Sequence, residues 1–502
     1  MRPPARTRYH GGSMSHAMTR SLFGARTCLL LPVLLILGIL GAAACTRSPG
    51  AVGPASELRS FTGAPARVVW VQGDGTDPYA AGNNLVLMGL DSEDGKGERA
   101  ILSERGSYVK PLLTPRGNRI IFSTSPRGDG PEIFIVNWDG SGLRRVAPGF
   151  ALTVWEHPTD GSEWLYVGTD GKEYDFATVS RFPIDDPSKS ELVWNQTLVS
   201  ADTFQVSADG RHAGGLFPWP NAGIAELPNR SLQKVGEGCW TALTTTRGPL
   251  FWYFDGAHRN LLMFHAATEA RWTVPINGAP SFDNPEVYHP RWTNHPRFLA
   301  MSGPYNRGGA NQVRSGGAQA EVWLGRFSED YTAVEAWLQV TKNEGGDSYP
   351  DVWIDRARSE VAAGTRGRIG PAAPEPARPA DPSTGSGPAP RADAPRRVVL
   401  EARLTHAGPI PTPQSILPYR HALVVSEYDV VKVAEGSYEQ GKIRVAHWAI
   451  RDGRVLAAEG RAVGSTSRLT VERYDAHPEL EGERLITDLG SSDLALYYDV
   501  AR

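Results

Sequence analysis

The sequence predicts an all-β protein: a β-propeller of six blades, with seven as the alternative, followed by a small second β domain. Three observations support this prediction. A strand–turn–strand pattern recurs at intervals of about 40 to 50 residues, a spacing typical of propeller blades. Glycine, proline and tryptophan number 54, 39 and 14 among 502 residues, and long amphipathic helical patterns are hard to find. A stretch rich in proline and alanine at 367–395 then separates the repeats from a further series of strands.

The first element is an export signal. The positive charges of Arg20 and Arg26 precede an uncharged apolar run at 29–40, which is too short to span a bilayer as a stable helix. The small residues before Cys45 resemble the lipobox of bacterial lipoproteins, although Ala42 stands where leucine is usual. This resemblance implies that 1–45 is a signal peptide with its lipid, such as palmitate, on Cys45, and that 46–65 is a short tether. An ordinary signal peptide or an uncleaved anchor is the alternative.

The rest of the composition excludes some classes of function. Formal net charge is only -3, so the chain lacks the basic footprint of a nucleic-acid-binding protein. Apart from Cys28 in the signal and Cys45, Cys239 is the only cysteine. Its neighbours carry no catalytic signature, which favours a buried structural thiol.

The repeat at 66–366 is clearest at Thr114–Gly149. It reads as a tight turn at Arg116-Gly117, an apolar strand, a loop and a second strand that a turn at Asp139-Gly140 closes. Weaker copies or units begin at His157, Val206, Thr244, His289 and Ser348. The strand that begins at Arg67 is expected to complete the last blade and close the ring, because closure removes exposed sheet edges.

These repeats resemble the TolB-like (WD40-like) β-propeller family, whose blade reads as a Ser-Pro-Asp-Gly turn, a strand, and a second strand leading to Asp-Gly-Ser. The match is good in Thr114–Gly149, where Trp138-Asp139-Gly140-Ser141-Gly142 stands for the last motif, and fair in Val206–Gly215. It is poor where His295-Pro296-Arg297 replaces the turn. The resemblance implies the fold but not an activity, because propellers host many unrelated functions.

The C-terminal domain, 396–502, carries about six candidate strands, which fit a small OB-like barrel or a sandwich. Its polar side chains suggest a ligand-binding site, with Tyr419, Arg420, His447 and His477 as candidates. Strand alternation places His447 on the apolar face, so a core histidine is the alternative interpretation.

Enzyme signatures are scarce. The sequence has no Gly-x-Ser-x-Gly elbow, P-loop, Rossmann fingerprint or HExxH motif. Three histidines at predicted blade turns or strand starts, His157, His289 and His295, are weak candidates for metal ligands. The chain somewhat resembles oligogalacturonate lyases, propellers with a histidine-bound divalent metal, but their ligands are not matched residue by residue. We expect the three histidines to be dispersed, and no cofactor.

We therefore expect a lipid-anchored protein of the bacterial cell envelope, facing the periplasm or the exterior, that acts by binding. The propeller would be presented to a protein or polysaccharide partner, with the C-terminal domain as a second module on a flexible arm. One alternative is a metal-dependent polysaccharide lyase or hydrolase with a histidine site in the propeller. Another is a structural subunit of an envelope complex without a small ligand.

Overall fold

The chain divides into two units, 1–50 and 51–502, and the structure describes residues of the second. The computed structural model describes residues 53–74, 82–126, 130–172, 174–201, 203–244, 250–305, 319–359, 369–371, 397–416, 419–456, 462–489 and 494–501. The expected signal peptide, Cys45 and most of the linker at 367–395 lie outside these ranges. Across the described ranges, no helix is both long and apolar enough to cross a membrane.

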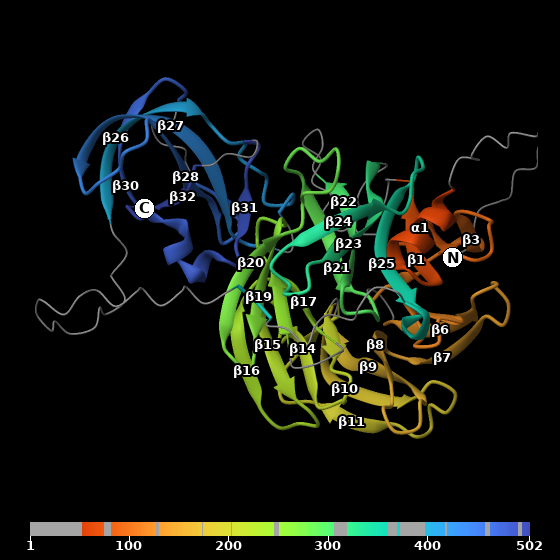
Figure 1. Cartoon of the computed structure of the whole chain (residues 1–502). Coiled ribbons are helices and arrows are strands. Elements are labelled where there is room, and N and C mark those ends of the chain that lie inside the picture. Colours follow the sequence, from red (N-terminus) through yellow and green to blue (C-terminus); the bar gives the residue numbers. More distant parts are fainter. Residues whose placement is uncertain are drawn as a thin grey trace, which may run out of the picture. The chain divides into compact units, whose positions relative to one another are not determined.

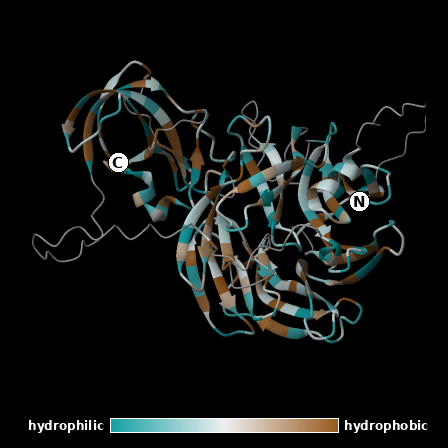
Figure 2. Cartoon of the chain, viewed as in Figure 1, coloured by the Kyte–Doolittle hydropathy of each residue, from teal (hydrophilic) through white to brown (hydrophobic). Residues whose placement is uncertain are grey.

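The described part of the propeller has six antiparallel blades, which confirms the predicted fold and settles the number of blades (Figure 1). Hydrophobic and hydrophilic segments alternate along the blade strands (Figure 2), as expected for strands that bury side chains between blades. The first blade in sequence consists of β4 (Val109–Leu113), β5 (Arg119–Ser123), β6 (Glu132–Asn137) and β7 (Arg144–Pro148), and the second of β8 (Phe150–Glu156), β9 (Glu163–Lys172), β10 (Asp175–Pro183) and β11 (Glu191–Trp194), with β12 (Val199–Ser200) also paired to β10. The third consists of β13 (Phe204–Val206), β14 (His212–Leu216), β15 (Asn221–Glu226) and β16 (Leu232–Glu237), and the fourth of β17 (Cys239–Leu243), β18 (Leu250–Phe254), β19 (Asn260–His265) and β20 (Ala270–Pro275). The fifth consists of β21 (Glu286–Trp292), β22 (Phe298–Tyr305), β23 (Glu321–Phe327) and β24 (Val334–Gln339).

The sixth blade closes the ring as the sequence predicted. Its inner strand is β25 (Gly346–Ile354), and its other strands come from the start of the propeller: β1 (Ala66–Gly73), β2 (Leu85–Asp91) and β3 (Arg99–Gly106). Strands β25 and β1 are antiparallel, with Ala66 opposite Ile354. The buried Trp70 indole donates a hydrogen bond of 2.8 Å to Asp347, which ties the two ends of the propeller together.

A short helix precedes the propeller, in the segment where the sequence indicated only a tether. Helix α1 (Pro54–Thr62) begins with proline, whose fixed φ suits the first turn, and ends at Gly63 with φ 63°. Its Leu58 is fully buried in a hydrophobic cluster with Phe298 of β22. The helix therefore packs on the propeller next to the strands that close the ring.

Four inner strands carry the same backbone feature, a non-glycine residue with positive φ: Lys110 (51°), Trp240 (39°), His289 (53°) and Tyr349 (53°). Each lies within a shift of strand register. Such bulges re-aim side chains. The rings of Trp240, His289 and Tyr349 are buried and lie with centroids 4.0 to 6.0 Å apart, so neighbouring inner strands meet in one aromatic cluster.

The C-terminal domain is a barrel rather than a sandwich (Figure 1). Five strands close in the order β26–β27–β28–β32–β30 and back to β26, with β28 and β32 parallel. With these five strands numbered along the chain, this is the order 1-2-3-5-4-1 of an OB-type Greek-key barrel. The described elements of the barrel are β26 (Val398–His406), β27 (Ala422–Glu435), β28 (Lys442–Arg451), β29 (Arg454–Val455), β30 (Thr466–Arg473), β31 (Arg484–Ile486) and β32 (Leu496–Asp499), with 3-10 turns at Tyr474–Ala476 and Pro478–Leu480. A further 3-10 turn, Arg356–Arg358, follows β25 of the propeller.

The barrel packs on the propeller, which differs from the expected flexible arm. Tyr419 and Ile416 belong to the same buried cluster as Trp240. A polar network lies beside this cluster, in which both Arg484 nitrogen–oxygen distances to Glu286 are 2.6 Å and His258 Nε2 lies 2.9 Å from the Tyr419 hydroxyl. The barrel is thus held by apolar burial together with a buried ion pair.

Candidate functional site

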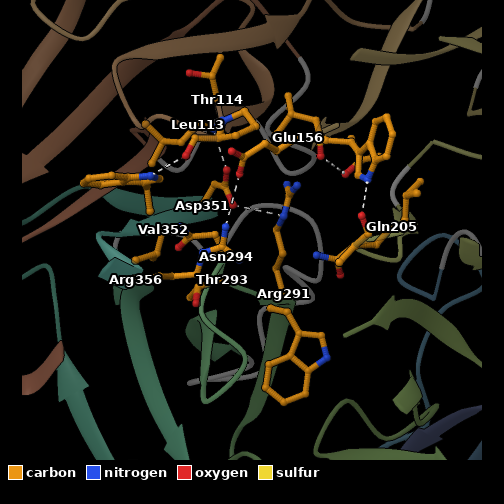
Figure 3. A pocket seen from close by; sticks show the side chains of 18 of the residues that line it. Leu113, Thr114, Glu156, Gln205, Arg291, Thr293, Asn294, Asp351, Val352 and Arg356 are labelled. Atoms are coloured by element: carbon orange, nitrogen blue, oxygen red, sulfur yellow. Dashed lines mark hydrogen bonds and ion pairs between the residues drawn. The ribbon is translucent and has the colours of Figure 1, made fainter. Parts of the chain in front are cut away.

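A pocket of about 360 Å³ opens where the inner strands of the propeller end (Figure 3). Five of the six inner strands contribute to it: β4, β8, β13, β21 and β25. Its volume falls in the range of roughly 300–1,000 Å³ typical of small-ligand sites. The lining consists of Leu113, Thr114, Pro115, Thr153, Val154, Trp155, Glu156, His157, Pro158, Gly161, Gln205, Val206, Ala208, Arg291, Trp292, Thr293, Asn294, Asp351, Val352, Trp353 and Arg356.

Arg291 and Asp351 are the central charged pair of this pocket. Arg291 Nε lies 3.3 Å from Asp351 Oδ1, and the two side chains are 15% and 10% exposed. The other carboxylate oxygen accepts a 2.7 Å hydrogen bond from the backbone N–H of Leu113. Burial raises the pKa of Asp351, while the Arg291 guanidinium and backbone N–H donors act in the opposite direction. Three inner strands therefore fix the position of this pair.

The terminal nitrogens of Arg291 donate no hydrogen bond to a described residue. Figure 3 shows the guanidinium beside Asp351 and facing the pocket. The side-chain amide of Gln205, also in the lining, forms no hydrogen bond within the described ranges either. In contrast, the Asn294 amide both donates to the backbone carbonyl of Ile354, at 2.9 Å, and accepts from its N–H, at 2.7 Å. The pocket thus holds free hydrogen-bonding capacity at Arg291 and Gln205.

The rim of the pocket is more exposed and is paired within itself. Arg356 lies 3.4 Å from Glu156, with side chains 44% and 46% exposed. The Trp353 indole donates to the Pro115 carbonyl at 2.8 Å and lies against Gly117. These contacts shape the opening but add little stability, because exposed ion pairs contribute little.

The opposite ends of the inner strands are in a different environment. The barrel contacts the propeller near the starts of β17 and β21, through Cys239 and Glu286. A second hollow of about 530 Å³, lined by Glu321, Trp323 and Phe282 among others, also lies at this end. Behind it, burial and the charges of Glu321 and Glu98 raise the pKa of Asp347 to about 8. The pocket around Arg291 is therefore at the propeller end that does not contact the barrel.

The three candidate metal ligands lie in different surroundings. His157 is half-exposed at the pocket, where Nδ1 is 3.4 Å from Asp160. His289 belongs to the buried aromatic cluster, and His295 is 2% exposed with its ring against Phe298. Among the described residues, no three His, Cys, Asp or Glu side chains are grouped so that they could hold a metal ion.

The candidate ligand-binding residues of the barrel are also in separate settings. Tyr419 is 1% exposed at the contact with the propeller, and the neighbouring Arg420 is exposed. His447 is 1% exposed inside the barrel, between the Tyr428 hydroxyl at 2.8 Å and Asp499 at 3.0 Å, as the core interpretation had it. His477 pairs with Glu479 at 2.8 Å beside a 3-10 turn.

Sequence reasoning missed Arg291 and Asp351. Both follow a bulge within an inner strand, two residues after His289 and Tyr349. Each residue directly follows a proline within its strand, Pro290 or Pro350, and this is a local sequence feature that the two positions share. Their pairing has no signal in the sequence, because the strands are far apart along the chain.

Comparisons with known proteins found distant similarity in structure and none in sequence. No protein-family model and no curated protein matches the chain in sequence. Among solved structures, TolB from Acinetobacter baumannii is similar at 13% identity and a TM-score of 0.39, over 59% of this chain and 70% of TolB. A putative 6-phosphogluconolactonase from Bacteroides uniformis is similar at 11% identity and a TM-score of 0.34, over 56% of this chain and 84% of the other. The assignment of six blades rests on the strand pairing of this chain and not on these similarities.

Proposed function

We propose that this protein is a lipid-anchored binding module of the bacterial cell envelope, which holds a partner at the pocket end of its propeller. The single observation behind this proposal is the pocket of about 360 Å³ with hydrogen-bonding groups unused by the described residues. The barrel contacts the other end of the propeller, so the pocket end is left for a partner. The location follows from the export signal and from Cys45.

The lining favours a protein partner over a polysaccharide. Sugars commonly stack on exposed aromatic faces. Trp155 and Trp292 are 7% and 2% exposed, and Trp353 lies against Gly117. The described residues gather no metal-ligand group, so no observation favours the lyase or hydrolase alternative.

Photo-crosslinking in the native cell tests the proposal. A photoreactive amino acid replaces His157 at the pocket, and in a control variant it replaces Leu198, an exposed residue outside the lining. We expect a discrete adduct from position 157 only, and a protease should degrade its added mass. The proposal is wrong if neither position 157 nor position 198 gives an adduct, or if both positions give the same adducts. Added mass that only glycosidases remove would indicate the polysaccharide partner.

A further inference from the structure

Arg291, in the pocket, contacts a neighbouring side chain through only one edge of its guanidinium group. Arg291 contacts Asp351 through Nε at 3.3 Å, and its two terminal nitrogens make no hydrogen bond with the described residues. A guanidinium is planar and carries five N–H donors. With Nε turned toward Asp351, the Nη1–Nη2 edge remains as a pair of parallel donors, which matches the spacing of the two oxygens of a carboxylate.

The backbone fixes the direction of this edge. Arg291 follows the bulge at His289, and Asp351 follows the corresponding bulge at Tyr349 on the adjacent inner strand. The Leu113 N–H holds Asp351 from a third inner strand. Asp351 is therefore a positioning residue, because it orients Arg291 without using the edge that faces the pocket.

The remaining charges near the pocket do not compete for this role. Arg356 is 44% exposed and lies near Glu156, and Glu156 is the nearest other carboxylate in the lining. The Arg291 side chain is 15% exposed, and a carboxylate placed at its Nη1–Nη2 edge forms two charge-assisted hydrogen bonds. Gln205 supplies an amide in the same pocket, suited to a neighbouring peptide group.

We propose that the Arg291 edge is a receptor for a peptide carboxylate, which the partner inserts into the propeller pocket. This inference rests on the proposed function, because it names the group that the pocket end recognises. The C-terminal carboxylate of a chain fits better than a uronate, because the lining tryptophans present little free aromatic face for a sugar ring.

The test uses N-acetyl-trialanine with a free carboxylate, the same peptide as its C-terminal amide, and trigalacturonate. Binding to the full chain is measured by ligand-observed NMR titration up to about 20 mM, the range suited to weak fragments. We expect saturable binding of the acid, and binding of the amide at least tenfold weaker. Arg291→Gln should weaken binding of the acid at least tenfold, and Arg291→Lys less. Arg358→Gln, an exposed arginine outside the lining, should bind like the wild type.

Three results would overturn the inference: equal binding of acid and amide, no saturable binding of the acid, or preference for trigalacturonate over the tripeptide. If Arg291→Gln does not fold, the comparison of acid and amide on the wild-type protein still decides. The crosslink from position 157 is independent of this chemistry. A specific adduct there, together with no preference for the acid, would leave the proposed function standing and refute the carboxylate receptor.

Discussion

The substitution Arg484→Met tests how much the buried ion pair at the barrel–propeller contact contributes to the free energy of unfolding. Arg484 and Glu286 are 3% and 4% exposed and bind each other at 2.6 Å. Burial alone would raise the pKa of Glu286, but the charge of Arg484 and the contact with His258 lower it from 4.5 to about 2. This shift corresponds to roughly 3 kcal/mol in favour of the ionised carboxylate. Removing one partner of a buried pair typically costs about 3–5 kcal/mol.

We therefore expect Arg484→Met to lower the free energy of unfolding by about 3–5 kcal/mol near pH 7. Urea denaturation followed by tryptophan fluorescence measures it. Arg473→Met is the control, because its pair with Asp475 is 50% and 67% exposed and should contribute less than about 1 kcal/mol. The double variant Arg484→Met, Glu286→Leu should recover most of the loss, because it leaves no unpaired buried charge.

The pH dependence gives a second measurement of the same pair. The pKa of Glu286 is lower in the folded protein than in the unfolded chain. Its ionised form therefore contributes stability that is present above about pH 4.5 and is lost as pH falls through about 2. The difference between wild type and Arg484→Met should therefore shrink from pH 6 to pH 3. A loss below 1 kcal/mol at pH 7, or a difference that is constant across that interval, would refute the reasoning.

Three further predictions test other parts of the molecule. Burial first, and then the charges of Glu321 and Glu98, raise the pKa of Asp347 from 3.8 to about 8, so folded Asp347 keeps a proton that the unfolded chain has already lost at pH 5. The wild type therefore loses stability as pH rises from 5 to 8, and Asp347→Asn should gain stability relative to it over that interval; parallel pH curves would contradict this. Gly117→Ala, with φ 68° and a Cβ position 2.3 Å from Trp353, should lower the thermal midpoint clearly more than Gly95→Ala, with φ 65° and open space, so equal shifts would show that Trp353 yields freely. Cys45→Ala should release the protein from membranes or block its maturation, measured by detergent partitioning, and unchanged membrane association would count against the lipid anchor.

The sequence by itself determined the propeller, its closure and the following β domain. Each depends on local patterns: a turn such as Arg116-Gly117 needs a glycine at positive φ, which Gly117 adopts at 68°, and the apolar strand after it needs β-branched or aromatic residues. The sequence also placed the strand that begins at Arg67 in the last blade, because an open ring would leave strand edges exposed. Strand alternation further supported the core interpretation of His447.

Only the tertiary structure decided the site and the contact between the domains. Arg291 and Asp351 come from different inner strands, and the bulges at His289 and Tyr349 that aim them depend on pairing with neighbouring strands. Arg484 meets Glu286 although 198 residues separate them, so no local pattern announces the pair. The candidate metal ligands His157, His289 and His295 show the same limit. Residue type indicates which chemistry is available but not which side chains converge on one site. Convergence is set by packing between segments distant in the chain, which local propensity does not encode.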